Sequence, residues 1–174
     1  MPQVGIVMGS DTDLKIMKDA GDILDKFKVD YEYTIHSAHR LPRETAAYAE
    51  SAAGRGIKVL IAGAGGAAHL PGVIAAYSIL PVIGVPIQTP SLGGLDSLYS
   101  IVQMPKGIPV STMAINGSAN AALTAVSILA LSNPELGVRL KEYRNSFAQE
   151  VLTKDKRLKE IGVVSYLLYK EGHS

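Results

Sequence analysis

The stretch Lys58-Val-Leu-Ile-Ala-Gly-Ala-Gly-Gly-Ala-Ala-His-Leu-Pro-Gly72 predicts a buried strand that leads through a glycine-rich turn into a helix. Its first half, Val59 to Ala62, is apolar without alternation, which is typical of a strand covered by helices on both faces. The glycines that follow let a ligand approach the backbone closely and permit positive φ angles. His69 is the only titratable side chain of the turn, so we single it out as a candidate functional residue.

Two other interpretations of this turn come from the same glycines. They fit a tight connection that merely lets a helix pack close to the sheet. They also fit the dinucleotide-binding pattern G-x-G-x-x-A over residues 63–68, which is weak evidence by itself. That pattern expects an acidic residue about 20 positions later to hold the ribose hydroxyl. No acidic residue lies between Glu50 and Asp96, so the sequence argues against NAD binding.

Composition limits the classes of function. A chain of 174 residues fits one domain with a core of its own. It has no cysteine, which excludes a disulfide framework, a thiolate metal site and a cysteine nucleophile, and is compatible with a reducing cytoplasm. The net charge of +1, with scattered basic residues, predicts no nucleic-acid partner and no anionic membrane partner.

The uncharged span from Val59 to Leu95 is long enough to cross a bilayer but is broken by four prolines, so it predicts interior strands and turns instead. The N-terminus lacks the basic-then-apolar plan of a signal peptide, and we expect a cytoplasmic protein. Because 47% of the residues are apolar and only 19% are charged, we also expect surface buried between subunits.

Hydrophobic periodicity predicts five strands that alternate with helices. The strands are expected at residues 4–8, 31–35, 59–62, 81–86 and 110–115, and the helices at 14–27, 42–53, 71–78, 96–102 and 119–131, with Asp96 as a cap. This alternation predicts a three-layer αβα sandwich around a parallel sheet. We therefore expect a single domain with an α/β core at about 1–132 and a helical extension at about 133–174. Subunit packing is the expected role of the extension, and a solvated surface is the alternative.

Two further turns carry candidate site residues. Gly9-Ser-Asp-Thr-Asp13 places hydroxyls and free N–H groups at a helix start, which suits a phosphate, although simple capping explains the same residues. His39 and Arg40 follow the second strand, at the sheet edge where parallel sheets bind ligands. A structural role for His39 is the alternative. His36 and His39 lack a third ligand and would point to opposite faces of a strand, so we expect no metal.

Four segments together resemble one enzyme family. They are Gly9-Ser-Asp-Thr-Asp13, Ser37-Ala-His-Arg40, residues 63–72, and Asp96-Ser-Leu-Tyr-Ser-Ile-Val-Gln-Met-Pro105. In this order they closely resemble the bacterial N5-carboxyaminoimidazole ribonucleotide mutases of purine biosynthesis, over residues 3 to about 150. The resemblance implies a flavodoxin-like sandwich assembled as a homo-octamer. It also implies an isomerase that moves a carboxylate from an exocyclic nitrogen to a ring carbon of an aminoimidazole ribotide, without a metal or organic cofactor.

Residue roles follow from the same resemblance. It implies that His39 is the general acid and base, and that His69 lies with it in the reaction pocket. Substrate-binding roles are implied for Ser10, Asp13, Ser37, Arg40, Gly65, Gly66, Ala67 and Leu70, with Asp11 and Thr12 as further candidates. Among them, Arg40 would hold the phosphate. The Gly65-Gly66 backbone would line the carboxylate or CO2 pocket. Imidazole suits the acid–base role because it titrates near neutral pH.

Two rival functions stay open at this stage. One is the related carboxylase, which adds free CO2 directly to aminoimidazole ribotide. The Ala68-His-Leu-Pro71 continuation is absent from animal-type carboxylases, so the resemblance favours the mutase. The other rival is a non-catalytic nucleotide-binding module in which both histidines are structural. Relative to the family, residues 12, 36 and 41 differ and the turn at 116–118 is shorter, which affects positioning more than the expected chemistry.

Overall fold

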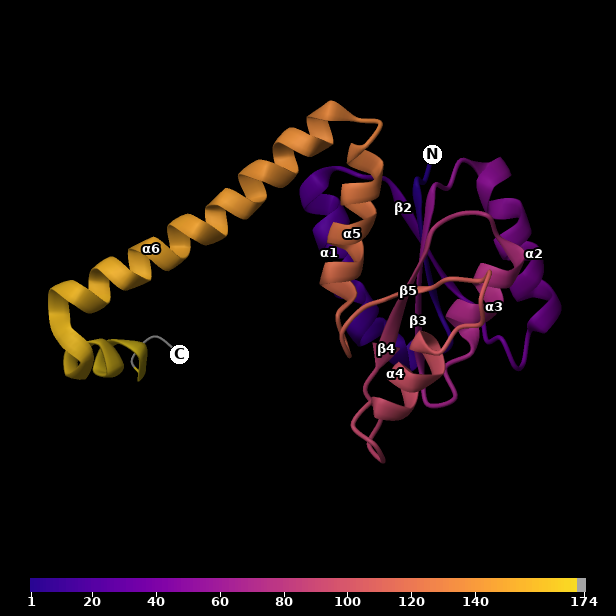
Figure 1. Ribbon diagram of the computed structural model, residues 1–174, viewed down its shortest axis with the longest axis horizontal. Coiled ribbons are helices and arrows are strands. Elements are labelled where there is room, and N and C mark those ends of the chain that lie inside the picture. Colours follow the sequence, from indigo (N-terminus) through magenta and orange to yellow (C-terminus); the bar gives the residue numbers. More distant parts are fainter. Residues whose placement is uncertain (172–174) are drawn as a thin grey trace. The chain divides into compact units, whose positions relative to one another are not determined.

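The computed structural model describes residues 1–171, and the chain divides into two compact units, Met1–Leu136 and Gly137–Ser174. The first unit is built on a parallel sheet of five strands in the order β2-β1-β3-β4-β5 (Figure 1). The strands are β1 (Val4–Met8), β2 (Tyr31–Ile35), β3 (Val59–Gly65), β4 (Val82–Ile87) and β5 (Ser111–Thr112). This is the flavodoxin-like strand order. The strand β2 lies on one side of β1, whereas β3, β4 and β5 follow on the other side, so the order switches between β1 and β3. The predicted fold class is confirmed.

Helices cover both faces of the sheet. On one face, α1 (Leu14–Phe27) packs beside α5 (Ser118–Ala130), as Figure 1 shows. On the other face lie α2 (Pro42–Ala52), α3 (Leu70–Tyr77) and α4 (Leu95–Val102). Two short 3-10 helices, η1 (Asp11–Asp13) and η2 (Ala53–Arg55), complete this unit before α6 begins at Pro134.

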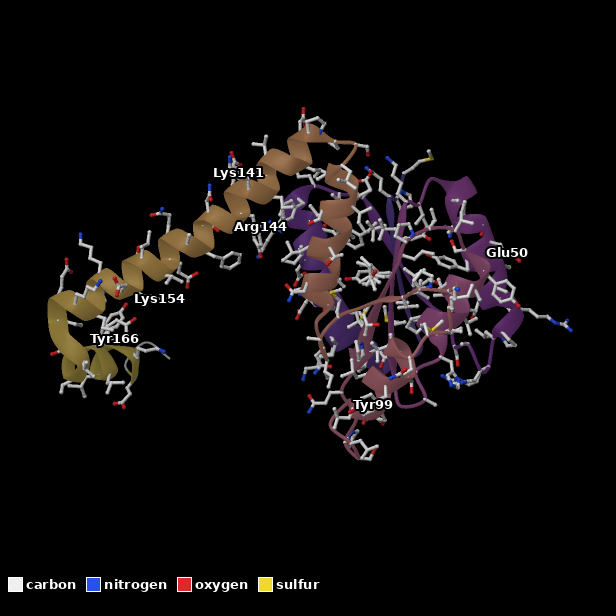
Figure 2. All side chains as sticks on the ribbon, in the orientation of Figure 1. Glu50, Tyr99, Lys141, Arg144, Lys154 and Tyr166 are labelled. Carbon is white, nitrogen blue, oxygen red and sulfur yellow. The ribbon has the colours of Figure 1, made fainter. Side chains whose placement is uncertain are left out.

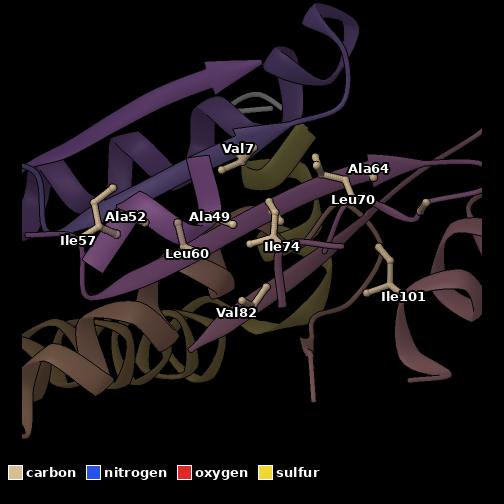
Figure 3. Packing of buried hydrophobic residues seen from close by; sticks show 12 residues of the cluster. Val7, Ala49, Ala52, Ile57, Leu60, Ala64, Leu70, Ile74, Val82 and Ile101 are labelled. Atoms are coloured by element: carbon tan, nitrogen blue, oxygen red, sulfur yellow. The ribbon is translucent and has the colours of Figure 1, made fainter. Parts of the chain in front are cut away.

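The core lies between the central strands and their helices. Figure 3 labels Leu60 and Val82 of the sheet, Ile74 of α3 and Ile101 of α4, which belong to one buried hydrophobic cluster. Each such buried side chain contributes about 1.5–3 kcal/mol of hydrophobic free energy. On the opposite face, a Cβ built on Gly63 would lie 2.4 Å from the Met17 sulfur, so the Met17 side chain of α1 fills the space that a larger residue would occupy. These contacts fix the central strands, and the site is built from the turns at their carboxyl ends.

Three sequence predictions differ from the structure by more than one residue. The strand expected at 59–62 continues through Gly65, so Gly63 to Gly65 belong to β3 and not to the turn. The strand expected at 110–115 pairs with β4 only at β5, because it lies at the sheet edge with no second neighbour. Single backbone hydrogen bonds continue beyond it, from Met113 to Gly84 and from Asn116 to Pro86. The prediction that Asp96 caps a helix is also wrong. Gly94, at φ 95°, is the N-cap of α4, which leaves the Asp96 carboxylate free for other contacts.

The second unit consists of the part of α6 (Pro134–Glu171) that lies beyond Leu136. The helix is interrupted at Gly162, whose φ of 73° and ψ of 166° are not helical. Lys154 before the interruption and Tyr166 after it, both labelled in Figure 2, line one cavity of about 440 Å³ within this unit. From Gly137 to Glu171 no side chain is buried. Over the described part of the chain, no helix combines the length and apolarity that a membrane crossing requires.

Candidate active site

A cavity of about 530 Å³ lies where the first four strands end. Each wall is a turn that follows a strand, so the carboxyl edge of the sheet brings together segments far apart in the sequence. The lining residues are Gly9, Ser10, Thr12, Asp13, Ser37, Ala38, His39, Arg40, Ala64, Gly65, Ala67, Ala68, His69, Leu70, Ile87, Gln88, Thr89 and Pro90. A cavity of this size accommodates a small metabolite.

The turn after β1 is held by its own side chains. The Ser10 hydroxyl accepts a hydrogen bond from the Thr12 amide at 3.3 Å, and the Asp13 carboxylate accepts one from the Ser10 amide at 3.2 Å. Asp13 is only 8% exposed. Burial raises the pKa of Asp13 and outweighs the opposing hydrogen bonds from Ser10, Thr12 and Gly9. A carboxylate accepts several hydrogen bonds, so Asp13 retains capacity for a ligand hydroxyl.

The turn after β2 supplies the cavity's fixed positive charge. The Leu41 amide donates to the Ser37 carbonyl at 2.8 Å, and the Arg40 Nε donates to the Ser37 hydroxyl at 3.2 Å. Among residues 1–171, no carboxylate forms an ion pair with Arg40. The guanidinium therefore remains free to bind an anionic group such as a phosphate.

The turn after β3 depends on one left-handed residue. Gly66 has a φ of +66°, a conformation that glycine adopts without strain. The chain then reaches His69, the N-cap of α3, whose amide donates to the Ala67 carbonyl at 2.7 Å. The side chain of His69 is thereby presented at the cavity wall.

His39 and His69 meet inside the cavity. The His39 Nε2 lies 2.7 Å from the His69 Nδ1, and the ring centroids are 4.8 Å apart at 74°. A hydrogen bond between two imidazoles requires one N–H and one lone pair, so each ring constrains the tautomer of the other. The pair can hold a proton at one position and exchange it with a ligand, which is the requirement for acid–base chemistry.

The structure brings together most of the residues singled out from the sequence. Those that line the cavity are Ser10, Thr12, Asp13, Ser37, His39, Arg40, Gly65, Ala67, His69 and Leu70. Two do not line it. The Gly66 amide is bonded to Ser97 instead, and Asp11 lines an adjoining cavity of about 430 Å³ together with Ile35 and Leu41.

Sequence reasoning missed the wall that follows β4, formed by Ile87, Gln88, Thr89 and Pro90. The signal was present, because this segment follows a buried parallel strand at the same sheet edge as the other three turns. Its residues carry no charge and no histidine, so the composition of the segment did not mark it as part of a site.

His36 does not line the cavity. Its ring packs against Tyr48 with centroids 5.1 Å apart, and burial lowers its pKa. Its Nδ1 is buried without a hydrogen-bond partner. Within the described residues, no group of three or more histidine, aspartate or glutamate side chains is arranged to hold a metal ion.

A flavodoxin-like sheet with two hydrogen-bonded histidines and an unpaired arginine at its carboxyl edge defines a small-molecule site equipped for proton transfer. The chain belongs to the AIR carboxylase family, whose model matches residues 3–150. It is 57% identical to the N5-carboxyaminoimidazole ribonucleotide mutase of Thermotoga maritima, over 98% of this chain and 100% of that protein. The resemblance to the bacterial mutases is confirmed.

Two other relatives bear on the comparison. The chain is 54% identical to the phosphoribosylaminoimidazole carboxylase of Schizosaccharomyces pombe, over 95% of this chain but only 30% of that longer protein. The crystal structure of Treponema denticola PurE matches with a TM-score of 0.84 at 29% identity, covering 91% of this chain and 99% of that one. The relatives of this chain are therefore named for two related activities.

Proposed function

We propose that this protein is an N5-carboxyaminoimidazole ribonucleotide mutase of de novo purine biosynthesis, and that His39 is its general acid and base. The product is the isomer that carries the carboxylate on ring carbon 4. The observation that carries the mechanism is the 2.7 Å contact between His39 and His69 inside the cavity. The 57% sequence identity to the T. maritima mutase over 98% of this chain supports the choice of reaction.

The proposed reaction returns the proton that it uses. His39 donates a proton to the exocyclic nitrogen as the N–C bond to the carboxylate breaks and CO2 forms. Ring carbon 4 then bonds to that CO2, and the proton displaced from this carbon passes back to the histidine. One N–C bond is exchanged for one C–C bond with no net oxidation, so the balance needs no co-reactant. General acid–base catalysis of this kind contributes a factor of about 10² to 10⁴.

The walls of the cavity suggest how the substrate lies. Arg40 binds the phosphate, because its guanidinium is the fixed cation that lines the cavity and Ser37 orients it. Asp13 and Ser10 bind ribotide hydroxyls. Gly65, Ala67 and Leu70 enclose the carboxylate or CO2 beside His69 without offering a nucleophile. Gly66 contributes through the shape of the turn, since its amide is already hydrogen-bonded.

The reaction is tested by incubating the protein with the N-carboxylated ribotide in the absence of ATP and added bicarbonate. Formation of the ring-carboxylated isomer is the expected result. A direct carboxylase would instead require added CO2 and aminoimidazole ribotide, while a binding module would bind the ribotide without converting it. Either of those results would contradict the mutase assignment.

We further propose that the second unit packs against other copies of the chain in a cytoplasmic homo-oligomer, with an octamer as the expected number. Between Gly137 and Glu171 large apolar side chains are exposed, among them Phe147, Val151, Val163, Val164, Leu167 and Leu168. Burying each one against a partner would contribute about 1.5–3 kcal/mol. Free in water, they would promote association.

Substituting Val164→Glu together with Leu168→Glu is expected to lower the molar mass measured by light scattering, because charges would then have to be buried at the interface. These side chains are 75% and 65% exposed, so the fold of a single chain should be unaffected. Lys156→Gln, on the part of α6 before Gly162, is the control and should leave the mass unchanged. An unchanged mass for the double variant would exclude this packing role.

A further inference from the structure

A buried hydroxyl of helix α4, that of Ser97, forms hydrogen bonds to the segments that follow β3 and end β4, and both segments contribute to the cavity. Ser97 is 0% exposed. Its Oγ accepts a hydrogen bond from the Gly66 amide at 2.9 Å and donates one to the Ile87 carbonyl at 2.7 Å. Gly66 belongs to the turn after β3, and Ile87 is the last residue of β4. Ser97 itself does not line the cavity.

This hydroxyl lies where the sheet stops. The pairing of β3 with β4 ends at Gly65 and Ile87. One residue further, the Gly66 amide and the Ile87 carbonyl no longer bond to each other, and the Ser97 hydroxyl bonds to both. The two strands can therefore diverge at this point without leaving backbone polar groups unpaired. Residues beyond this point on both strands line the cavity, among them His69 after β3 and Thr89 after β4.

Neighbouring side chains of α4 reinforce the same connection. The Asp96 carboxylate accepts from the Thr89 hydroxyl, with both oxygens at 2.9 Å, and from the Ser97 amide at 3.0 Å. The Ser100 hydroxyl donates to the Asp96 carbonyl at 2.7 Å and also contacts the Gly66 carbonyl at 3.3 Å. One turn of helix thus contacts Gly66, in the turn behind one wall, and Thr89, which lines the other.

The helix that carries these contacts is fixed in the core. Ile101 of α4 is 0% exposed and belongs to the same buried cluster as Ile74 and Val82, which Figure 3 also labels. A Cβ built on Gly84 would lie 2.5 Å from Ile101, so α4 sits directly against β4. Because α4 is held by the core, the hydrogen bond from Gly66 to Ser97 fixes the position of the turn that precedes His69 relative to this helix.

We propose that Ser97 is a positioning residue for the carboxyl transfer, acting through Gly66 to hold His69 within hydrogen-bond distance of His39. The inference rests on the proposed function, because it assigns Ser97 a part in that reaction. His69 follows Gly66 by three residues, and its amide bonds to Ala67 within the same turn. A shift of the turn therefore moves the imidazole. Misplacement of a reacting group by about 1 Å can reduce a rate about a hundredfold.

Replacing Ser97 with alanine should separate rate from binding. The variant leaves the Gly66 amide and the Ile87 carbonyl without their shared partner, and the turn must shift to find others. We expect kcat to fall about 10- to 100-fold. KM should change less than kcat, because Ser10, Asp13 and Arg40, which bind the ribotide hydroxyls and the phosphate, belong to the turns after β1 and β2. Ser97→Cys retains a weak donor and acceptor and should give an intermediate kcat.

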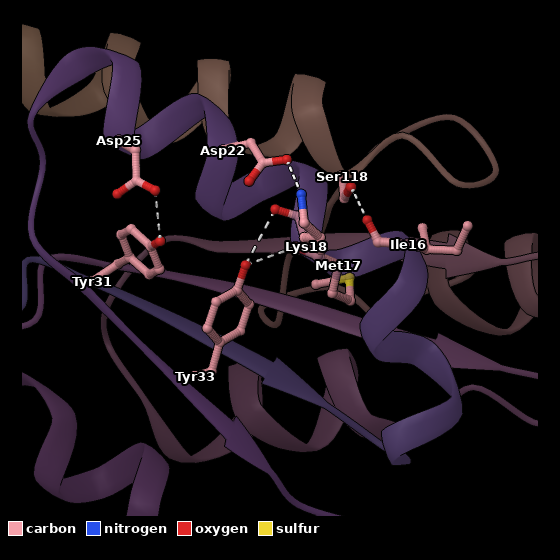
Figure 4. Close-up of polar contacts among 8 residues, drawn as sticks. All are labelled: Ile16, Met17, Lys18, Asp22, Asp25, Tyr31, Tyr33 and Ser118. Atoms are coloured by element: carbon pink, nitrogen blue, oxygen red, sulfur yellow. Dashed lines mark hydrogen bonds and ion pairs between the residues drawn. The ribbon is translucent and has the colours of Figure 1, made fainter.

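Ser118→Ala is the matched control. Ser118 is also 0% exposed, and its hydroxyl donates to the Ile16 carbonyl at 2.5 Å, a contact between α5 and α1 that Figure 4 shows. Removing the Ser118 hydroxyl should lower the free energy of unfolding about as much as removing the Ser97 hydroxyl does. It should leave kcat near that of the wild type. Hydrogen exchange provides a readout that does not depend on activity. Peptides containing Gly66 should exchange their amide hydrogens faster in Ser97→Ala than in the wild type. In Ser118→Ala their exchange rate should equal that of the wild type.

Two results would overturn the proposal. One is a kcat for Ser97→Ala equal to that of Ser118→Ala, with unchanged exchange at Gly66. The other is a fall in kcat/KM that lies entirely in KM. If Ser97→Ala fails to fold, Ser97→Cys decides, since a kcat and a Gly66 exchange rate equal to those of the wild type would also overturn it. If the wild-type protein does not isomerise the ribotide, the proposed function fails, and the exchange data still decide whether Ser97 holds the turn.

Discussion

The variant His39→Asn is expected to fold and bind the ribotide while losing turnover by a factor of about 10² to 10⁴. Asparagine can preserve a hydrogen bond at this position but cannot donate and take back a proton near neutral pH. His39 is exposed at the cavity wall, so its replacement opens no space in the core. Steady-state kinetics together with calorimetric titration of the ribotide would measure the two effects separately.

A histidine outside the cavity provides the control for this variant. His36→Asn should retain turnover, because His36 packs against Tyr48 and does not line the cavity. The double variant His39→Asn/His69→Asn should lose little more activity than His39→Asn alone, since groups that act as one unit give non-additive effects. Turnover by His39→Asn at more than about a tenth of the wild-type rate would remove His39 from the acid–base role.

The variant Arg40→Ala is expected to weaken ribotide binding about 10- to 100-fold. Hydrogen bonds to charged groups contribute about 1.5–3 kcal/mol, and each 1.4 kcal/mol is a factor of ten in affinity. No acidic side chain among residues 1–171 pairs with Arg40, so removing it leaves no buried charge uncompensated. Because the contact is ionic, the affinity of the wild type should also fall with added salt more steeply than that of the variant.

Two further variants sharpen the test of Arg40. Arg40→Lys keeps the charge but loses the planar fork, so its affinity should lie between those of the wild type and the alanine variant. Arg43→Ala removes an exposed arginine that does not line the cavity, and its affinity should be unchanged. If Arg40→Ala and Arg43→Ala bound the ribotide equally well, the phosphate would have to bind elsewhere.

Local patterns predicted the architecture well. The buried run from Val59, its glycine turn and the alternation of strands with helices were sufficient to predict a parallel sheet with helices on both faces. The edge strand β5 was predicted too long, because apolar residues there pack without pairing on a second side. The cap of α4 was misassigned because Gly94 adopts a left-handed conformation that propensities do not reveal.

The site was predictable only in part. Strand ends and motif resemblance pointed to His39, Arg40 and His69. The contact between His39 and His69 spans 30 residues and depends on β1 lying between the strands that carry them. The hydroxyl of Ser97 bonds to the Gly66 amide and the Ile87 carbonyl, at the point where the pairing of β3 with β4 ends. Neither contact has a local sequence signal, since both arise only when distant segments are assembled.

The central claim is that the carboxyl group moves within one bound ribotide. The most direct measurement supplies unlabelled N-carboxylated ribotide in a medium containing ¹³C-bicarbonate, with no ATP, and follows the isotope in the ring-carboxylated product by mass spectrometry at early times. The mutase account predicts product whose carboxylate is almost entirely unlabelled. Product that carries the label of the medium from the first turnovers would contradict it.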